Sequence, residues 1–201
     1  STPHVYELGP GLTAGRHRLT IRIDNRLHID VGINAHSVSD HTQSNWNGIV
    51  GDLLLKVTDL FWLDSVDVFP NVTNKSIKLT LYIGNASTSL GRAKLSFVAR
   101  GYNTDRPHQA PPMSATIDIQ PGGTMMEVEY HLGSDAHLWD EFDPALYQLE
   151  IRLEVESGGQ RYTDHRIDSF GLREFKTSGT QFTINGRTTF LRGTLDCAIF
   201  P

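Results

Sequence analysis

A long polar stretch, NAHSVSDHTQSNWNG at residues 34–48, concentrates the side chains of this chain that are best suited to bind a small polar molecule. It supplies amide, carboxylate, imidazole and indole groups through Asn34, His36, Asp40, His41, Gln43, Asn45 and Trp46. Planar amides and carboxylates bond to hydroxyl groups, and an aromatic face covers the C–H side of a sugar ring. These residue types are suited to contact with a sugar. The interpretation that carries more weight from the sequence is a structural loop in which Trp46 packs into the fold.

The same region is also the densest histidine cluster of the sequence, with His28, His36 and His41 close to Asp40. Zinc sites combine histidines at motif spacing with a further ligand. The spacing here matches no such motif, so loop polarity or substrate contact explains the cluster better than a metal does.

Two other groups of acidic residues lie outside this stretch. WDEFD combines Asp140, Glu141 and Asp143 but lacks the ligand ladder and turn glycine of a calcium loop. MEVEYH places Glu127, Glu129 and His131 on one face of a predicted strand. We interpret the first as a solvated loop and the second as a wet sheet face, and we expect neither a metal nor a cofactor.

Composition narrows the class of protein further. The 201 residues are 38% hydrophobic and carry a formal net charge of −5. Nucleic acids and anionic membranes attract clustered Lys and Arg, which this chain lacks, so we predict neither as a partner. No apolar run approaches the ~20 residues of a membrane helix. The single cysteine, Cys197, excludes an internal disulfide and a cysteine-rich zinc site.

Alternation of polar and apolar residues predicts strand after strand. The segments are residues 17–23, 27–33, 49–70, 77–83, 93–101, 114–120, 124–132, 146–156 and 161–175. The nearest approach to a helical period, HLWDEFDPALYQ, is interrupted by Pro144 and is predicted to be a loop that leads into a strand. The fold class is therefore all-β, and several strands with one buried face imply a sandwich.

The last part of the chain carries a hairpin signal. Asn185-Gly186 separates two short apolar segments, and both residues tolerate the positive φ of a tight hairpin turn. Just before it, KTSGTQ marks a shift in composition near Lys176, where we place a domain boundary.

The ordered set of motifs resembles glycoside hydrolase family 2, which includes β-galactosidases, β-glucuronidases and β-mannosidases. The segments that carry the resemblance are WNGIVGDLLLKV, LWDEFDPALYQLEI, FGLREF and FTINGRTTFLRGTLD. It implies the C-terminal part of a jelly-roll domain at residues 1–57 and an immunoglobulin-like sandwich at 58–176. Residues 177–201 would then be a hairpin and the first strand of a truncated (β/α)8 catalytic barrel.

The resemblance also implies what the chain does. The two catalytic glutamates of the family lie on later barrel strands, so no catalytic residue is carried over. We expect a non-catalytic fragment that spaces and buttresses the barrel of a retaining glycosidase, with carbohydrate and the remaining domains as partners and with a periplasmic or extracellular location. The alternative is a free-standing carbohydrate-binding sandwich that uses Trp46 and Trp139.

Substrate contact in the whole enzyme is expected from two places. One is the polar loop, through Asn34, His36, Asp40, His41, Gln43 and Trp46; the other is the first barrel strand, through Arg192 and Asp196. Residues 1–57 would supply only part of a jelly roll. Because unpaired strand edges invite pairing with another chain, we expect self-association.

Overall fold

The computed structural model describes residues 4–9, 12–24, 26, 30, 32–34, 48–49 and 51–195. They fall into two units, one made of the described residues before Lys56 and the other spanning Lys56–Leu195. No helix in the described ranges is long and apolar enough to cross a membrane.

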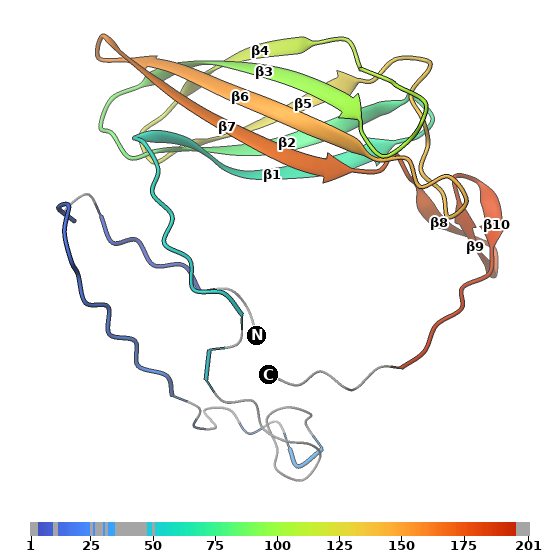
Figure 1. Ribbon diagram of the computed structural model, residues 1–201, viewed down its shortest axis with the longest axis horizontal. Helices are drawn as coiled ribbons and strands as arrows, with labels where there is room; N and C mark the ends of the chain where they lie inside the picture. Colours follow the sequence, from blue (N-terminus) through green and yellow to red (C-terminus); the bar gives the residue numbers. More distant parts are fainter. Residues whose placement is uncertain are drawn as a thin grey trace. The chain divides into compact units, whose positions relative to one another are not determined.

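Seven of the described strands form a two-layer antiparallel sandwich (Figure 1). One sheet has the order β1-β2-β5, and the other has the order β4-β3-β6-β7. The strands are β1 (Phe61–Asn71), β2 (Ser76–Asn85), β3 (Gly91–Gly101), β4 (Met113–Ile119), β5 (Thr124–His131), β6 (Tyr147–Ser157) and β7 (Gln160–Phe170). The predicted all-β sandwich is confirmed.

The core lies between the two sheets and follows directly from the alternation. On β6, the inward-facing residues Tyr147, Leu149, Ile151, Leu153 and Val155 are all buried. They meet Ile77, Leu79, Leu81 and Ile83 of β2 in one hydrophobic cluster. Burying one such side chain stabilises the fold by roughly 1.5–3 kcal/mol, so this cluster supplies the main driving force for folding.

Charged side chains close the edge where β1 and β7 meet. The carboxylate of Asp164 on β7 accepts a hydrogen bond from the backbone N–H of Leu63 at 2.8 Å. Arg166 donates to the backbone carbonyl of Asp64 at 3.1 Å and pairs with Asp168 at 2.7 Å. The register between β1 and β2 shifts between Leu63 and Ser65, which marks a β-bulge in β1. Side chains of β7 thus bond to backbone groups of β1 beside this bulge.

Three predicted strands are shorter or absent in the structure, and a fourth, at residues 27–33, lies mostly outside the described residues. The segment expected to run through residues 49–70 is a strand only from Phe61, and the one expected to reach Phe175 ends at Phe170. Residues 17–23 form none of the assigned strands, and Leu19, Ile21 and Ile23 are exposed. Alternation marks a segment that can form a strand, but a ladder also needs a neighbouring strand to bond with.

A second, smaller sheet follows the sandwich. It consists of β8 (Phe175–Ser178), β9 (Gln181–Ile184) and β10 (Arg187–Thr189), in the order β10-β9-β8. Asn185 and Gly186 connect β9 to β10 with φ angles of 50° and 79°. The predicted hairpin is therefore confirmed, with both turn residues in the left-handed region. Lys176, where the boundary was expected, lies inside β8 and pairs with Thr183.

Candidate functional site at the joint between the sandwich and the small sheet

Two of the predicted substrate-binding residues lie in the described part of the chain. Asn34 is exposed in a turn of the first unit, and Arg192 is exposed beyond β10 in the second. The other six lie outside the described residues: His36, Asp40, His41, Gln43, Trp46 and Asp196. A shared binding role for these eight residues stays a prediction.

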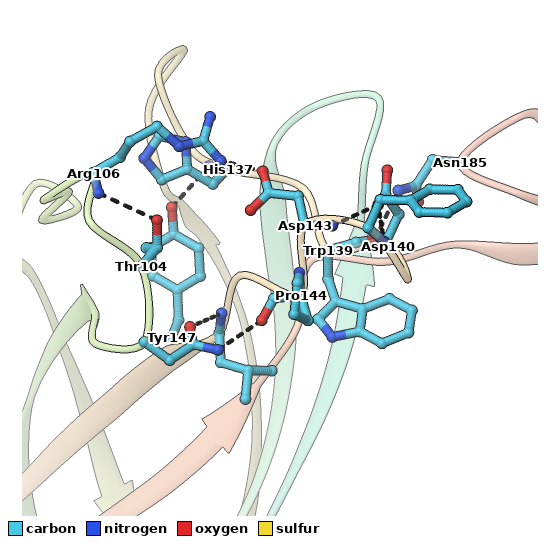
Figure 2. A network of polar contacts seen from close by, with 12 residues as sticks. Thr104, Arg106, His137, Trp139, Asp140, Asp143, Pro144, Tyr147 and Asn185 are labelled. Atoms are coloured by element: carbon cyan, nitrogen blue, oxygen red, sulfur yellow. Dashed lines mark hydrogen bonds and ion pairs between the residues drawn. The ribbon is translucent and has the colours of Figure 1, made fainter.

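The connection between β5 and β6, residues 132–146, has a defined structure of its own. The carboxylate of Asp140 accepts hydrogen bonds from the backbone N–H groups of Phe142 and Asp143, at 2.8 and 2.9 Å. These two bonds lower the pKa of Asp140. Arg106, on the connection between β3 and β4, forms an ion pair with Asp143 (Figure 2). The WDEFD segment is a loop, as predicted, and its acidic groups hold the loop together.

Asn185 fastens this loop to the small sheet (Figure 2). Its side-chain amide Nδ2 donates a hydrogen bond to the carbonyl oxygen of Trp139 at 2.9 Å. Its Oδ1 accepts from the backbone N–H of Glu174, and its own N–H donates to the carbonyl of Glu174, each at 2.9 Å. The backbone N–H of Trp139 donates to the carbonyl oxygen of Leu172 at 3.0 Å. One turn residue thus binds the β5–β6 connection and the segment that leads into β8.

Charged and aromatic groups reinforce the same joint. Glu141 pairs with Arg187 of β10 at 2.7 Å, and the hydrogen bond from Arg187 lowers the pKa of Glu141. The guanidinium of Arg187 also lies 5.1 Å from the ring centroid of Phe142. Cation–aromatic contacts at such exposed positions contribute little to stability by themselves.

Trp139 is enclosed at the joint on two sides. A Cβ atom built on Gly171 would lie 3.0–3.2 Å from Trp139 atoms, so this position accommodates the tryptophan best as glycine. The guanidinium of Arg173 lies 4.6 Å from the centroid of its ring. The half-buried Trp139 thus packs against Gly171 and Arg173, and its use as a sugar platform stays a prediction.

The small sheet presents an apolar surface. Phe175 of β8 and Phe182 of β9 stack with ring centroids 5.4 Å apart and an interplanar angle of 20°. Both remain exposed, at 47% and 42%, and Phe190 beyond β10 is 85% exposed. Exposed apolar groups gathered in this way are typical of surfaces that contact another protein surface.

The second acidic group from the sequence lies where it was predicted, on the outer face of β5. Glu127 pairs with Lys78 of the neighbouring strand at 2.8 Å, and Glu129 accepts a hydrogen bond from Ser76 at 2.7 Å. Among the residues that the structure describes, no group of three or more His, Cys, Asp or Glu side chains is placed to hold a metal ion.

The role of the Asn185 side chain is not evident from the sequence. The Asn-Gly turn is, but Trp139, the partner of the side chain, lies 46 residues away in the chain. The asparagine before the glycine is the only local hint of this contact. The positive φ of the turn is enough to explain an asparagine at that position.

Comparison with known proteins gives a match in structure alone. No protein-family model and no curated protein matches this chain. Among solved structures, it is similar to a glycosyl hydrolase family 2 member from Bacteroides cellulosilyticus, with a TM-score of 0.53 and 18% identity over 69% of this chain. It is also similar to the β-glucuronidase of Bacteroides uniformis, with a TM-score of 0.54 and 16% identity over 68% of this chain.

The extent of these matches limits what they show. The similar region covers 19% and 17% of those two chains, so this chain spans less than a fifth of their length. At such identities the similarity shows the fold, an all-β sandwich that also occurs within larger glycosidases.

Proposed function

We propose that this chain is a non-catalytic β-sandwich portion of a larger glycoside hydrolase of family 2. In the parent enzyme, which hydrolyses O-glycosidic bonds, it spaces and buttresses the catalytic barrel. The ordered sequence motifs and the similarity of fold to family 2 structures support this proposal. The polar loop at residues 34–46, together with Arg192 and Asp196, would contact substrate in the parent.

The joint is the observation that carries the proposal. A spacer must transmit a fixed orientation, and the bond from Asn185 to Trp139 and the Glu141–Arg187 pair tie the small sheet to the sandwich. The uncovered rings of Phe175 and Phe182 then offer an apolar surface for the next domain to pack against. Two polar contacts on one side and an exposed apolar surface on the other suit a part that joins two larger bodies.

The electrostatics of the described carboxyl groups support a non-catalytic role. A retaining glycosidase needs two carboxyl groups about 5–5.5 Å apart, one of them kept protonated by a raised pKa. Where the pKa of a described carboxyl departs from its ordinary value, at Asp24, Asp140, Glu141 and Glu150, it is lowered. In each case hydrogen bonds to the charged form are the leading cause, which favours a carboxylate over a proton donor.

The test is an assay of the pure chain against aryl β-galactoside, β-glucuronide and β-mannoside, together with a titration by galactose, glucose, mannose, arabinose and glucuronate. We expect no turnover and no saturable change in tryptophan fluorescence. Measurable turnover would overturn the proposal. Saturable binding of one sugar without turnover would favour the free-standing carbohydrate-binding module instead.

A further inference from the structure

Two histidines and a tyrosine form a hydrogen-bonded cluster beneath the β5–β6 connection. Tyr147, the first residue of β6, is fully buried. Its hydroxyl oxygen accepts a hydrogen bond from the backbone N–H of His137 at 2.8 Å (Figure 2). The same hydroxyl lies 3.0 Å from Nδ1 of His108, on the β3–β4 connection. The cluster thus links two loops and a strand.

The direction of these bonds determines the protonation state that the cluster requires. Because the tyrosine oxygen accepts from His137, its hydroxyl hydrogen is free to be donated to Nδ1 of His108. Nδ1 accepts it in the neutral tautomer that carries its hydrogen on Nε2, and in that tautomer the tyrosine hydroxyl is satisfied both as acceptor and as donor. Protonation of His108 places a hydrogen on Nδ1 and removes the acceptor of the Tyr147 hydroxyl.

The surroundings of His108 disfavour a positive charge. The rings of His108 and His137 lie 5.6 Å apart edge to face, and Nε2 of His137 is buried with no hydrogen-bond partner among the described residues. Burial is the main cause that lowers the pKa of His108, followed by His137 and, more weakly, Lys75, against an opposing effect of Asp135. Arg106, on the same connection as His108, is paired with Asp143.

The cluster is continuous with the joint. His137, whose N–H is held by Tyr147, lies two residues before Trp139. The N–H of Trp139 is held by Leu172, and its carbonyl accepts the bond from Asn185. Residues 137–139 are therefore fixed at one end by the histidine cluster and at the other by the small sheet.

We propose that protonation of His108 releases the β5–β6 connection at His137 and so weakens the hold of Trp139 on Asn185, which makes the joint looser in mildly acidic solution. The meaning of this switch for a larger enzyme rests on the proposed spacer function. The switch itself depends only on the contacts within Lys56–Leu195.

The sign of the effect follows from linkage. A histidine whose pKa is lower in the folded than in the unfolded state contributes stability that is fully present above its ordinary value of 6.5. That contribution is lost as the pH falls through the lower, folded-state value. Acidification should therefore loosen the joint. Raising the pH further above 6.5 should not increase the stability of the joint.

The experiment is amide hydrogen exchange followed by NMR on the whole chain, corrected for the intrinsic effect of pH. The reporters are the N–H groups of His137, Trp139 and Asn185, with Leu81 of β2 as the reporter of the sandwich core. Between about pH 7.5 and about pH 5.0, we expect protection of the three joint amides to fall severalfold while that of Leu81 falls less. Equal protection at both pH values would overturn the proposal.

Two variants identify the titrating group. His108→Gln retains an oxygen that can accept from Tyr147 but cannot be protonated, so it should abolish the loss of protection. The matched control, His131→Gln on the exposed face of β5, should retain that loss. If amide protection at the joint still falls at low pH in His108→Gln, His108 is not the titrating group. If that variant does not fold, a pH titration of the wild-type protein followed by NMR provides the test. The chemical shifts of the His108 ring and of the Trp139 and Asn185 amides should then change with the same midpoint pH. Different midpoints would overturn the switch.

The same data separate the two proposals. Joint amides that are unprotected even at about pH 7.5 would contradict the rigid spacer. Joint amides that are protected equally throughout would contradict the switch alone.

Discussion

The side chain of Asn185 donates a hydrogen bond to the carbonyl oxygen of Trp139 over 2.9 Å, across 46 residues of chain. It joins the turn of the small sheet to the loop that precedes β6. Since the same side chain also accepts from the N–H of Glu174, the two sides of the joint meet at one residue.

Replacing Asn185 by Asp should loosen the joint selectively. Aspartate tolerates the φ of 50° and keeps an oxygen for Glu174, but it cannot donate to Trp139. We expect a loss of about 1–2 kcal/mol in the local opening free energy of the small sheet, because the Trp139 carbonyl loses its partner. Hydrogen exchange of β9 and β10 measures it. Asn185→Gly, which keeps the turn but loses both side-chain bonds, should exchange faster still. An unchanged pattern in both variants would show that the side chain contributes nothing.

Asp164 offers a test of the sandwich edge. Asp164→Ala leaves the backbone N–H of Leu63 without its acceptor and should lower the free energy of unfolding by about 1 kcal/mol, since the site is partly buried. Asp164→Asn keeps an acceptor oxygen in place, so its loss in free energy of unfolding should be less than half of the loss in Asp164→Ala. Urea denaturation of both variants measures the difference. Equal losses in the two would point to the negative charge, and not the hydrogen bond, as the stabilising feature.

The strands of the sandwich core could be predicted because their alternation is regular. On β2, the apolar residues Ile77, Leu79, Leu81 and Ile83 occupy every second position, and all four are buried. The Asn185-Gly186 hairpin was equally predictable, since its conformation is set by its own two residues. These features depend on neighbours along the chain or on a simple two-residue period.

The β1–β7 edge and the joint could not be predicted in the same way. Asp164 and Arg166 are charged, yet both bond to backbone groups of β1 about 100 residues away, while Asp168 pairs with Arg166 on its own strand. The polar loop at residues 34–48 is a different case, since residues 35–47 lie outside the described residues and the predicted site stays a prediction.

Asn85 should be among the most sensitive polar positions of the fold. It is 2% exposed, and its Nδ2 lies within hydrogen-bond distance of the carbonyl oxygens of Ser89, Ile119 and Gln120. Asn85→Ala should cost about 2–3 kcal/mol, because it leaves buried carbonyl groups without a donor. Thermal and urea denaturation provide the measurement. The control, Asn74→Ala in the exposed β1–β2 turn, should stay within about 0.5 kcal/mol of the wild type. Similar losses in the two variants would contradict the role given to Asn85.

Self-association is expected from the first unit. Leu19, Ile21 and Ile23 alternate along the chain and are 70%, 46% and 50% exposed in that unit. Such segments pair readily with another strand. Light scattering across a concentration series should show a mass above the 22.4 kDa of one chain, and Ile21→Lys should reduce it. A single-chain mass at every concentration would count against the expectation. Thr20→Lys, on the opposite set of alternating positions, serves as the control.

The sandwich and the small sheet should behave as one rigid body held by Asn185 and Trp139. Residual dipolar couplings of the backbone amides in β1–β7 and in β8–β10, recorded at neutral pH in weakly aligned solution, measure their relative orientation. One alignment tensor should fit both sets of amides in the wild-type protein, and Asn185→Gly should require a second tensor for β8–β10. Two separate tensors already in the wild-type protein would show that the joint is not rigid.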